Sequence, residues 1–208
     1  IESQQASDKF GSIQIVMDCS IFNADDFPTP HIKTTDAQRV LLSISKIGIV
    51  RTLSKINGRF CFAAFDTKTN TAYLARDRFG LSTLFYTCFD GLIAFSSRAK
   101  GLLAIPGVSN ELDNSFLKAA AAINYRFLDT NNSLSPFRDI KQVPQGTIVR
   151  FDDKKMQIER FASLTVDGIG RSKKPTREEY IHLFNEAVSK RLRIAKKPIF
   201  SLSGGLDS

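Results

Sequence analysis

The stretch Ile56-Asn57-Gly58-Arg59-Phe60-Cys61-Phe62-Ala63-Ala64-Phe65-Asp66 decides the fold that the sequence predicts. Asn57-Gly58 is a tight-turn signal, and the apolar run after it is typical of a buried strand. Residues 67–70 predict a hairpin loop with a returning strand over 71–77, and Asp90-Gly91 predicts a second hairpin between 84–87 and 92–97. Repeated hairpins predict an antiparallel sheet, which helices over 35–47 and 98–104 would cover.

Outward from these hairpins, the same rules predict the rest of the first domain. Residues 12–17 are apolar enough for a strand, and 18–23 are interpreted as a turn into another short element. Thr35 and Gln38 have the spacing of a capping box that begins a helix, whose buried stripe is Val40, Leu41, Ile44 and Ile47. Asp113 caps a further helix, and 147–151 predict a strand.

A polar, glycine-bearing segment over 162–175 predicts a linker to a second domain. Thr176 and Glu179 form another capping box. The helix after it is expected to bury the apolar positions Tyr180, Leu183, Phe184, Ala187, Val188 and Leu192.

The last ten residues, Ile199-Phe200-Ser201-Leu202-Ser203-Gly204-Gly205-Leu206-Asp207-Ser208, run from a strand-like approach into a glycine pair flanked by hydroxyls. Such a sequence is typical of a phosphate-binding loop, because glycines let the backbone approach an anion and successive amides point at it. Asp207 would then hold a magnesium ion that bridges phosphates. The alternative is a Ser/Gly turn capped by Asp, and spacing alone leaves both open.

Composition narrows the function classes. The chain has 208 residues, 42% of them hydrophobic, and no apolar window of transmembrane length or signal peptide. Its three scattered cysteines predict a reduced, cytoplasmic setting. The net charge is +8, but no basic run is interleaved with aromatics, so we expect neither nucleic acid nor a membrane as partner. We expect the chain to be an internal fragment of a longer protein, since it lacks an initiator Met and ends where a helix should begin.

Several motifs resemble the class B, glutamine-hydrolysing asparagine synthetases. Residues 57–104 resemble the amidotransferase domain of this family, with Asn57-Gly58-Arg59-Phe60, Ala75-Arg76-Asp77-Arg78-Phe79-Gly80 and Phe95-Ser96-Ser97-Arg98-Ala99-Lys100 in family order. Residues 137–147 resemble the segment that closes that domain, and Ser203–Ser208 with the helix segment 187–193 resemble the pyrophosphate loop of N-type ATP pyrophosphatases.

The resemblance implies a fold and a division of the chain. It implies an N-terminal-nucleophile hydrolase-like αββα sandwich over 1–161, with its N-terminal part missing. A linker over 162–175 follows, and 176–208 would begin an α/β ATP-pyrophosphatase domain of the adenine nucleotide α-hydrolase type.

The resemblance also implies an activity. The enzyme would be a carbon–nitrogen ligase that converts aspartate, ATP and glutamine or ammonia to asparagine, AMP and pyrophosphate, with ATP and Mg²⁺ as cofactors, in the cytoplasm and with a homodimer as one allowed assembly. ATP and pyrophosphate would lie on Leu202, Ser203, Gly204, Gly205, Leu206, Asp207 and Ser208, and Mg²⁺ on Asp207. The fragment alone is expected to be inactive, because the family's N-terminal cysteine nucleophile is not in it and the internal cysteines lack the free α-amine that serves as base.

The glutamine site is where the sequence departs from the family. Asp36 matches the family Asp that holds the α-ammonium of glutamine, although a helix-first-turn acid has the same place. Asp18, Cys19 and Ser20 stand where the family has Asn-Gly-Glu, whose Asn side chain and Gly amide form the oxyanion hole. Losing one such donor costs about 2.7–4 kcal/mol of barrier, so the sequence predicts an enzyme that uses ammonia at least as well as glutamine, or no external nitrogen.

Two functions therefore stay open. One is an asparagine synthetase that uses glutamine or ammonia. The other is a family relative whose first domain is structural and whose second forms another amide or closes a ring, as in β-lactam synthetases. Arg76-Asp77-Arg78 is interpreted in either case as a structural charged turn.

Overall fold

The computed structural model describes residues 3–8, 11–28, 34–122, 133–153, 155–163, 176–195, 197–200 and 203–205. The chain divides into two compact units, Ile1–Ser163 and Leu164–Ser208.

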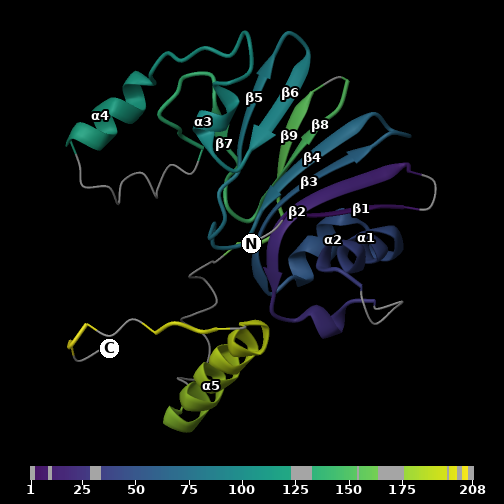
Figure 1. Cartoon of the computed structure of the whole chain (residues 1–208), viewed down its shortest axis with the longest axis vertical. Coiled ribbons are helices and arrows are strands. Elements are labelled where there is room, and N and C mark those ends of the chain that lie inside the picture. The colour runs from purple at the N-terminus through teal and green to yellow at the C-terminus, as the bar shows by residue number, and fades with distance from the viewer. Residues whose placement is uncertain are drawn as a thin grey trace. The chain divides into compact units, whose positions relative to one another are not determined.

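A six-stranded antiparallel sheet forms the centre of the first unit (Figure 1). Its order is β1-β2-β3-β4-β8-β9, with bounds Gln4–Ser7, Ile13–Ile21, Gly58–Asp66, Thr71–Arg76, Thr147–Phe151 and Met156–Arg160. The predicted hairpin joins β3 and β4, in which Asp66 pairs with Thr71. The pairing of β4 with β8 joins segments that are far apart in the sequence.

A second, three-stranded sheet packs on one face of the first. Its order is β6-β5-β7, with bounds Leu92–Ser96, Phe85–Phe89 and Lys141–Gln142. Tyr86 of β5 meets Phe151 of β8 edge to face, with ring centroids 5.5 Å apart. Cys61, Leu74 and Val149 are buried in the same cluster, which therefore forms the core between the two sheets.

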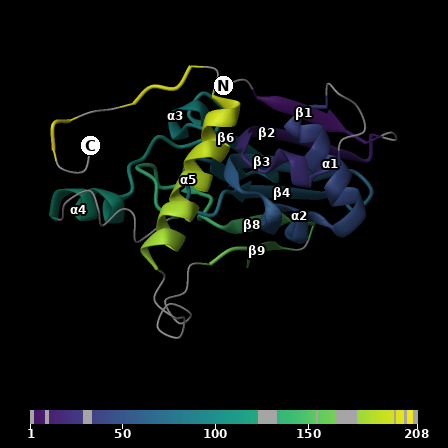
Figure 2. The same cartoon turned by 90° about the horizontal axis from the view of Figure 1, so that it is seen from below.

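Helices cover the outer faces of the two sheets. Helix α1 (Asp36–Ile47) packs on β1 and β2 (Figure 2), and α2 (Ile49–Lys55) packs beside α1 on the same face of the six-stranded sheet (Figure 1). Helix α3 (Ala99–Leu102) packs on β5 and β6. The unit also holds η1 (Ala24–Asp26) and α4 (Asn114–Ala122), at whose start Asp113 accepts from two amides. The predicted αββα sandwich is confirmed.

Three local predictions for this unit were wrong. Asn57-Gly58 forms no tight turn, since Gly58 is the first residue of β3 and is held extended by its pairing with Ile21. Residues 18–21 continue strand β2 instead of turning. Met17, Cys19 and Ile21 are all buried, so period-two burial against α1 outweighs the turn propensity of Asp18 and Ser20. The helix expected over 98–104 is confined to 99–102.

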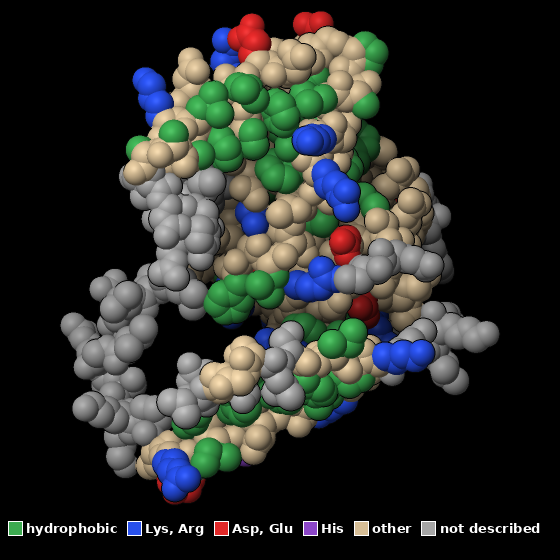
Figure 3. Space-filling model, turned by 60° about the vertical axis from the view of Figure 1, so that its left-hand side comes forward, with side chains coloured by type: hydrophobic (Ala, Val, Ile, Leu, Met, Phe, Trp, Pro, Cys, Tyr) green, Lys and Arg blue, Asp and Glu red, His purple; other side chains and the backbone are tan. Residues whose placement is uncertain are grey.

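The described part of the second unit holds one helix, α5 (Arg177–Ile194), with the predicted capping box of Thr176 and Glu179. Its apolar stripe is not buried as predicted: Tyr180, Leu183 and Phe184 are 63%, 60% and 56% exposed (Figure 3). The physical reason is that no second element of this unit packs on α5 among the described residues. Residues 197–200 form no strand, and residues 164–175 of the predicted linker lie outside the described residues.

No helix in the described part of the chain has the length and apolarity needed to cross a membrane.

Candidate functional site

The C-terminal half of β2 positions three of the predicted site residues. Cys19 points toward the helices, in one buried cluster with Met17 and Ile21. Asp18 and Ser20 are half-buried and, by the alternation of a strand, face the opposite side, toward the second sheet. The three residues that differ from the family sequence therefore lie on both faces of β2: Cys19 on the helix side, and Asp18 and Ser20 on the side of the second sheet.

Among the described residues, strand β1 pairs with β2 only as far as Met17. On the other side, the Phe22 amide donates to the Asn57 carbonyl at 2.7 Å. Because the amides of an antiparallel strand alternate between its two neighbours, the amides of Cys19 and Ile21 point away from β3.

Asp36 lies on the side of β2 that faces away from β3. It is the first residue of α1, and its carboxylate accepts a hydrogen bond from the Ile21 amide. The Thr35 capping box and a hydrogen bond of 3.1 Å from the Ala37 amide to Gln4 Oε1 hold the start of the helix against β1. The predicted glutamine-binding Asp36 and the backbone at Cys19 are therefore brought together.

The electrostatics of the site follow from burial and from two carboxylates. Burial raises the pKa of Asp36, against the opposing effects of Arg39 and the Ile21 amide. The pKa of Cys19 is raised to about 12, first by burial and then by Asp36 and Asp18, with Arg59 opposing. Cys19 is therefore a neutral thiol at pH 7, which agrees with the expectation that it is not the nucleophile.

The structure adds Arg59, a residue that sequence reasoning missed. Arg59 Nη2 lies 3.9 Å from Asp18 Oδ1, and the two side chains are 26% and 32% exposed. Only the strand register could have predicted this contact, because Ser20 pairs with Arg59 and Asp18 is therefore the diagonal neighbour of Arg59.

The backbone around Arg59 is anchored by two neighbours. At Gly58 an added Cβ would clash with the Ser20 carbonyl oxygen, so the absence of a side chain allows β2 and β3 to approach closely. On the other flank, the Phe60 amide donates to Asp77 Oδ2 at 3.3 Å and its carbonyl accepts from the Asp77 amide at 3.0 Å.

The Arg76-Asp77 turn has the structural role that was predicted. The two charged side chains form hydrogen bonds with backbone groups. Asp77 is fully buried and also accepts from the amides of Phe79, Leu81 and Ser82 at 2.9–3.1 Å. Arg76 is buried and donates to the carbonyls of Ser82, Gly80 and Val143. The turn therefore fixes the end of β4 beside the start of β3.

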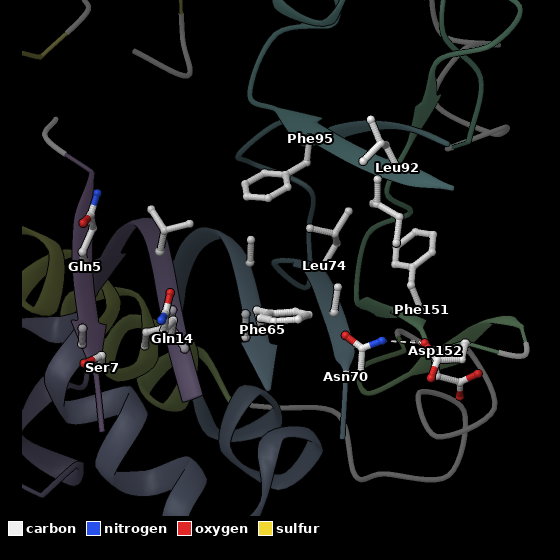
Figure 4. Close-up of a pocket in the computed structure, with 18 of the residues that line it drawn as sticks. Gln5, Ser7, Gln14, Phe65, Asn70, Leu74, Leu92, Phe95, Phe151 and Asp152 are labelled. Atoms are coloured by element: carbon white, nitrogen blue, oxygen red, sulfur yellow. Dashed lines mark hydrogen bonds between the residues drawn. The ribbon is translucent and has the colours of Figure 1, made fainter. Parts of the chain in front are cut away.

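A cavity of about 1220 Å³ lies between the face of the six-stranded sheet and β6 (Figure 4). Phe65, Leu74, Leu92, Phe95 and Phe151 form its apolar lining, and Gln5, Ser7, Gln14 and Asn70 add polar groups. None of the predicted glutamine-binding residues lines it.

The predicted phosphate loop is described only at Ser203, Gly204 and Gly205; Leu202, Leu206, Asp207 and Ser208 lie outside the described residues. Gly204 has φ 75° with open space where a Cβ would stand, and the Gly205 amide donates to Ser203 Oγ at 3.3 Å. A left-handed glycine with free space beside it fits an anion-binding turn. The described residues contain no group of three or more metal-ligating side chains.

Known proteins match this chain in sequence. A model of the glutamine amidotransferase domain matches residues 2–162. The asparagine synthetase [glutamine-hydrolyzing] 3 of Bacillus subtilis is 29% identical over 74% of this chain, and the enzymes named asparagine synthetase [glutamine-hydrolyzing] of Homo sapiens and Gallus gallus are 29% and 28% identical over 83% and 96%. The chain spans 24%, 30% and 35% of the length of these relatives.

Solved structures match the fold. The glutamine phosphoribosylpyrophosphate amidotransferase of B. subtilis, complexed with ADP and GMP, aligns with a TM-score of 0.52 over 79% of this chain and 32% of its own, at 16% identity. An allosteric regulatory enzyme of purine biosynthesis aligns with a TM-score of 0.50 over 78% of this chain and 31% of its own, also at 16% identity. At this identity the likeness concerns the fold alone, and the family rests on the sequence match. Because the family model spans most of the chain, this chain belongs to the glutamine amidotransferase domain family.

Proposed function

We propose that the full-length protein is an ATP-dependent amidotransferase that resembles asparagine synthetase. It would activate the side-chain carboxylate of aspartate with ATP, and ammonia would displace AMP to form asparagine, with pyrophosphate as the other product. The glutamine amidotransferase domain would supply the ammonia from glutamine.

The observation that carries this proposal is the extent of the sequence similarity. The family model ends at residue 162, but the alignment with the Gallus gallus enzyme covers 96% of the chain and must therefore include most of 176–208. An amidotransferase domain joined to the start of a synthetase domain, as we propose for 176–208, is the arrangement that a glutamine-dependent ligase needs.

Within the proposed site, Asp36 would hold the α-ammonium of glutamine. Burial raises the pKa of this carboxyl group, so a bound cation would offset the cost of ionising it. ATP and Mg²⁺ would be held by 202–208, with Asp207 on the metal. When bound, they supply the adenylate leaving group; Ser203 and Gly205 would contribute a hydroxyl and an amide to the phosphates.

A second candidate is a family relative whose first domain does not hydrolyse glutamine and whose second domain forms another amide or closes a ring. The observation that favours it is Asp18, which stands in the place of an oxyanion-hole donor.

The test is product analysis on the full-length protein with ATP and aspartate, with ammonia and glutamine supplied separately. We expect AMP and pyrophosphate, and asparagine if aspartate is the acceptor. ADP and inorganic phosphate as products would refute the assignment of 202–208. AMP and pyrophosphate formed only with another carboxylate, and without external nitrogen, would support the second candidate.

A further inference from the structure

Gln4 lies where β1 and the start of α1 follow each other along one side of β2. It is the first residue of β1 and pairs with Met17, the last residue of β2 that β1 reaches among the described residues. Further along β2, the Ile21 amide donates to the carboxylate of Asp36, the first residue of α1. Gln4 and Asp36 are therefore successive neighbours of the same strand.

The side chain of Gln4 joins this strand to the helix. Its Oε1 accepts a hydrogen bond of 3.1 Å from the Ala37 amide. The first amides of a helix have no partner within the helix, and Ala37 is 0% exposed, so water does not replace Gln4 there. Thr35 Oγ1 accepts from the next amide, that of Gln38, at 3.3 Å. Gln4 and Thr35 together therefore hold the first turn of α1.

The contacts of Gln4 and Asp36 form a closed ring between β1, β2 and α1. Gln4 pairs with Met17 through the backbone and accepts from Ala37 through its side chain. Asp36 precedes Ala37 in the chain and closes the ring through the Ile21 amide. A shift of the Ala37 amide would move Asp36 with it, so Gln4 helps to fix the distance between the Asp36 carboxylate and β2.

The Asp36 carboxylate retains the capacity to bind a cation. It is half-buried, and an ionised carboxylate has about four acceptor positions, of which the Ile21 amide takes one. Arg39, on the same helix, favours the ionised form, and Cys19 of β2 is a neutral thiol. A hydrogen bond from an ammonium group requires a heavy-atom distance near 3 Å, so the placement of this carboxylate decides how well it binds.

We propose that Gln4 is a positioning residue for Asp36: it holds the first turn of α1 so that the carboxylate stays in place for the α-ammonium group of glutamine. This inference rests on the proposed function for the role of Asp36 and for the identity of the ligand. Because Gln4 acts through Asp36, its loss should weaken substrate binding and leave the chemical step unchanged.

The experiment measures binding of L-glutamine to the full-length protein by calorimetry, together with KM and kcat where glutamine turns over. Gln4→Met keeps the length of the side chain without a strong acceptor, and we expect it to weaken binding about three- to thirtyfold, with a matching rise in KM and an unchanged kcat. Gln4→Glu keeps an acceptor and should restore most of the affinity. The matched control is Gln5→Met, because Gln5 is exposed on the opposite face of β1 and lines the cavity (Figure 4).

A second comparison separates positioning from a general loss of stability. If Gln4 acts through Asp36, Gln4→Met should weaken binding less than about twofold further when Asp36→Asn is already present. An equal weakening in both backgrounds would refute the proposal, since Gln4 would then act independently of the charge. An effect of Gln4→Met smaller than threefold on the otherwise unchanged protein would refute it too. If Gln4→Met fails to fold, Gln4→Thr, which suits a strand but is too short to reach Ala37, decides by the same measures.

The outcomes also distinguish this inference from the proposed function. A wild type that does not bind glutamine would overturn both. Glutamine binding that depends on Asp36 and not on Gln4 would overturn only the inference. Formation of AMP from ATP with ammonia and no glutamine tests the synthetase activity separately: its absence, with glutamine binding still dependent on Gln4, would overturn the proposed synthetase and leave the inference standing.

Discussion

Replacing Asp77 by Ala should loosen the junction of β3, β4 and the following turn. The Asp77 carboxylate accepts from four backbone amides, and two of these bonds, from Phe60 and Ser82, are buried. A buried amide left without a partner costs about 1–3 kcal/mol, so the loss of the two buried bonds should lower local stability by about 2–6 kcal/mol. The other two amides are partly solvated and add less.

Hydrogen exchange of the full-length protein measures this effect in peptides that cover 58–66 and 77–84. A loss of 2–6 kcal/mol corresponds to exchange that is faster by about 30-fold to about 10⁴-fold. The matched control is Asp113→Ala, because Asp113 also accepts from two backbone amides, but at the partly exposed start of α4. Loss of this helix cap should cost about 0.5–2 kcal/mol and stay local to α4. The reasoning would be contradicted if the exchange rate in these peptides rose less than tenfold in Asp77→Ala. It would also be contradicted if that rise were no larger than the rise that Asp113→Ala causes around α4.

Three further predictions concern the candidate site. Gly58→Ala should cost about 1–3 kcal/mol by overpacking against the Ser20 carbonyl, and an unchanged melting temperature would show that the strands can part there. Asp36→Asn should raise the free energy of unfolding at pH 7, because burial raises the pKa of Asp36 and its ionised form therefore destabilises the folded state at any pH above the ordinary pKa. The same substitution should weaken glutamine binding at least about tenfold; tighter binding would exclude a role for the charge. The pKa of Cys19 is raised to about 12, so its contribution to stability is complete below pH 9 and is lost as the pH rises toward 12; Cys19→Ala should remove that part of the pH dependence in alkaline unfolding curves, and identical curves would refute it.

Arg59 changes how the departure from the family sequence at Asp18 is understood. Read as a sequence, Asp18 removes a donor and adds a negative charge. In the sheet, this charge faces a guanidinium on the next strand. The prediction that ammonia serves at least as well as glutamine was made from Asp18 alone, and the structure pairs that carboxylate with Arg59.

Local chemistry alone determined the hairpins, the capped helices and the fold class. Asp90-Gly91 turns where predicted, and Thr35 and Thr176 form both sides of their capping boxes. Asn57-Gly58 is the exception, because Gly58 is the first residue of β3 and no tight turn forms there. Each of these signals acts within a few residues, so one chain segment contains its cause and its effect. The resemblance to a known family rested on such segments too.

Tertiary structure decided the features that depend on neighbours far along the chain. Residues 18–21 have turn-forming side chains, but the helices on one side of β2 bury Met17, Cys19 and Ile21 and keep the segment extended. The stripe of α5 has the spacing of a buried face, yet spacing cannot supply the element that would cover it. Arg59 meets Asp18 only because two strands pair in one register, since a slip of one residue would turn Arg59 to the opposite face of the sheet.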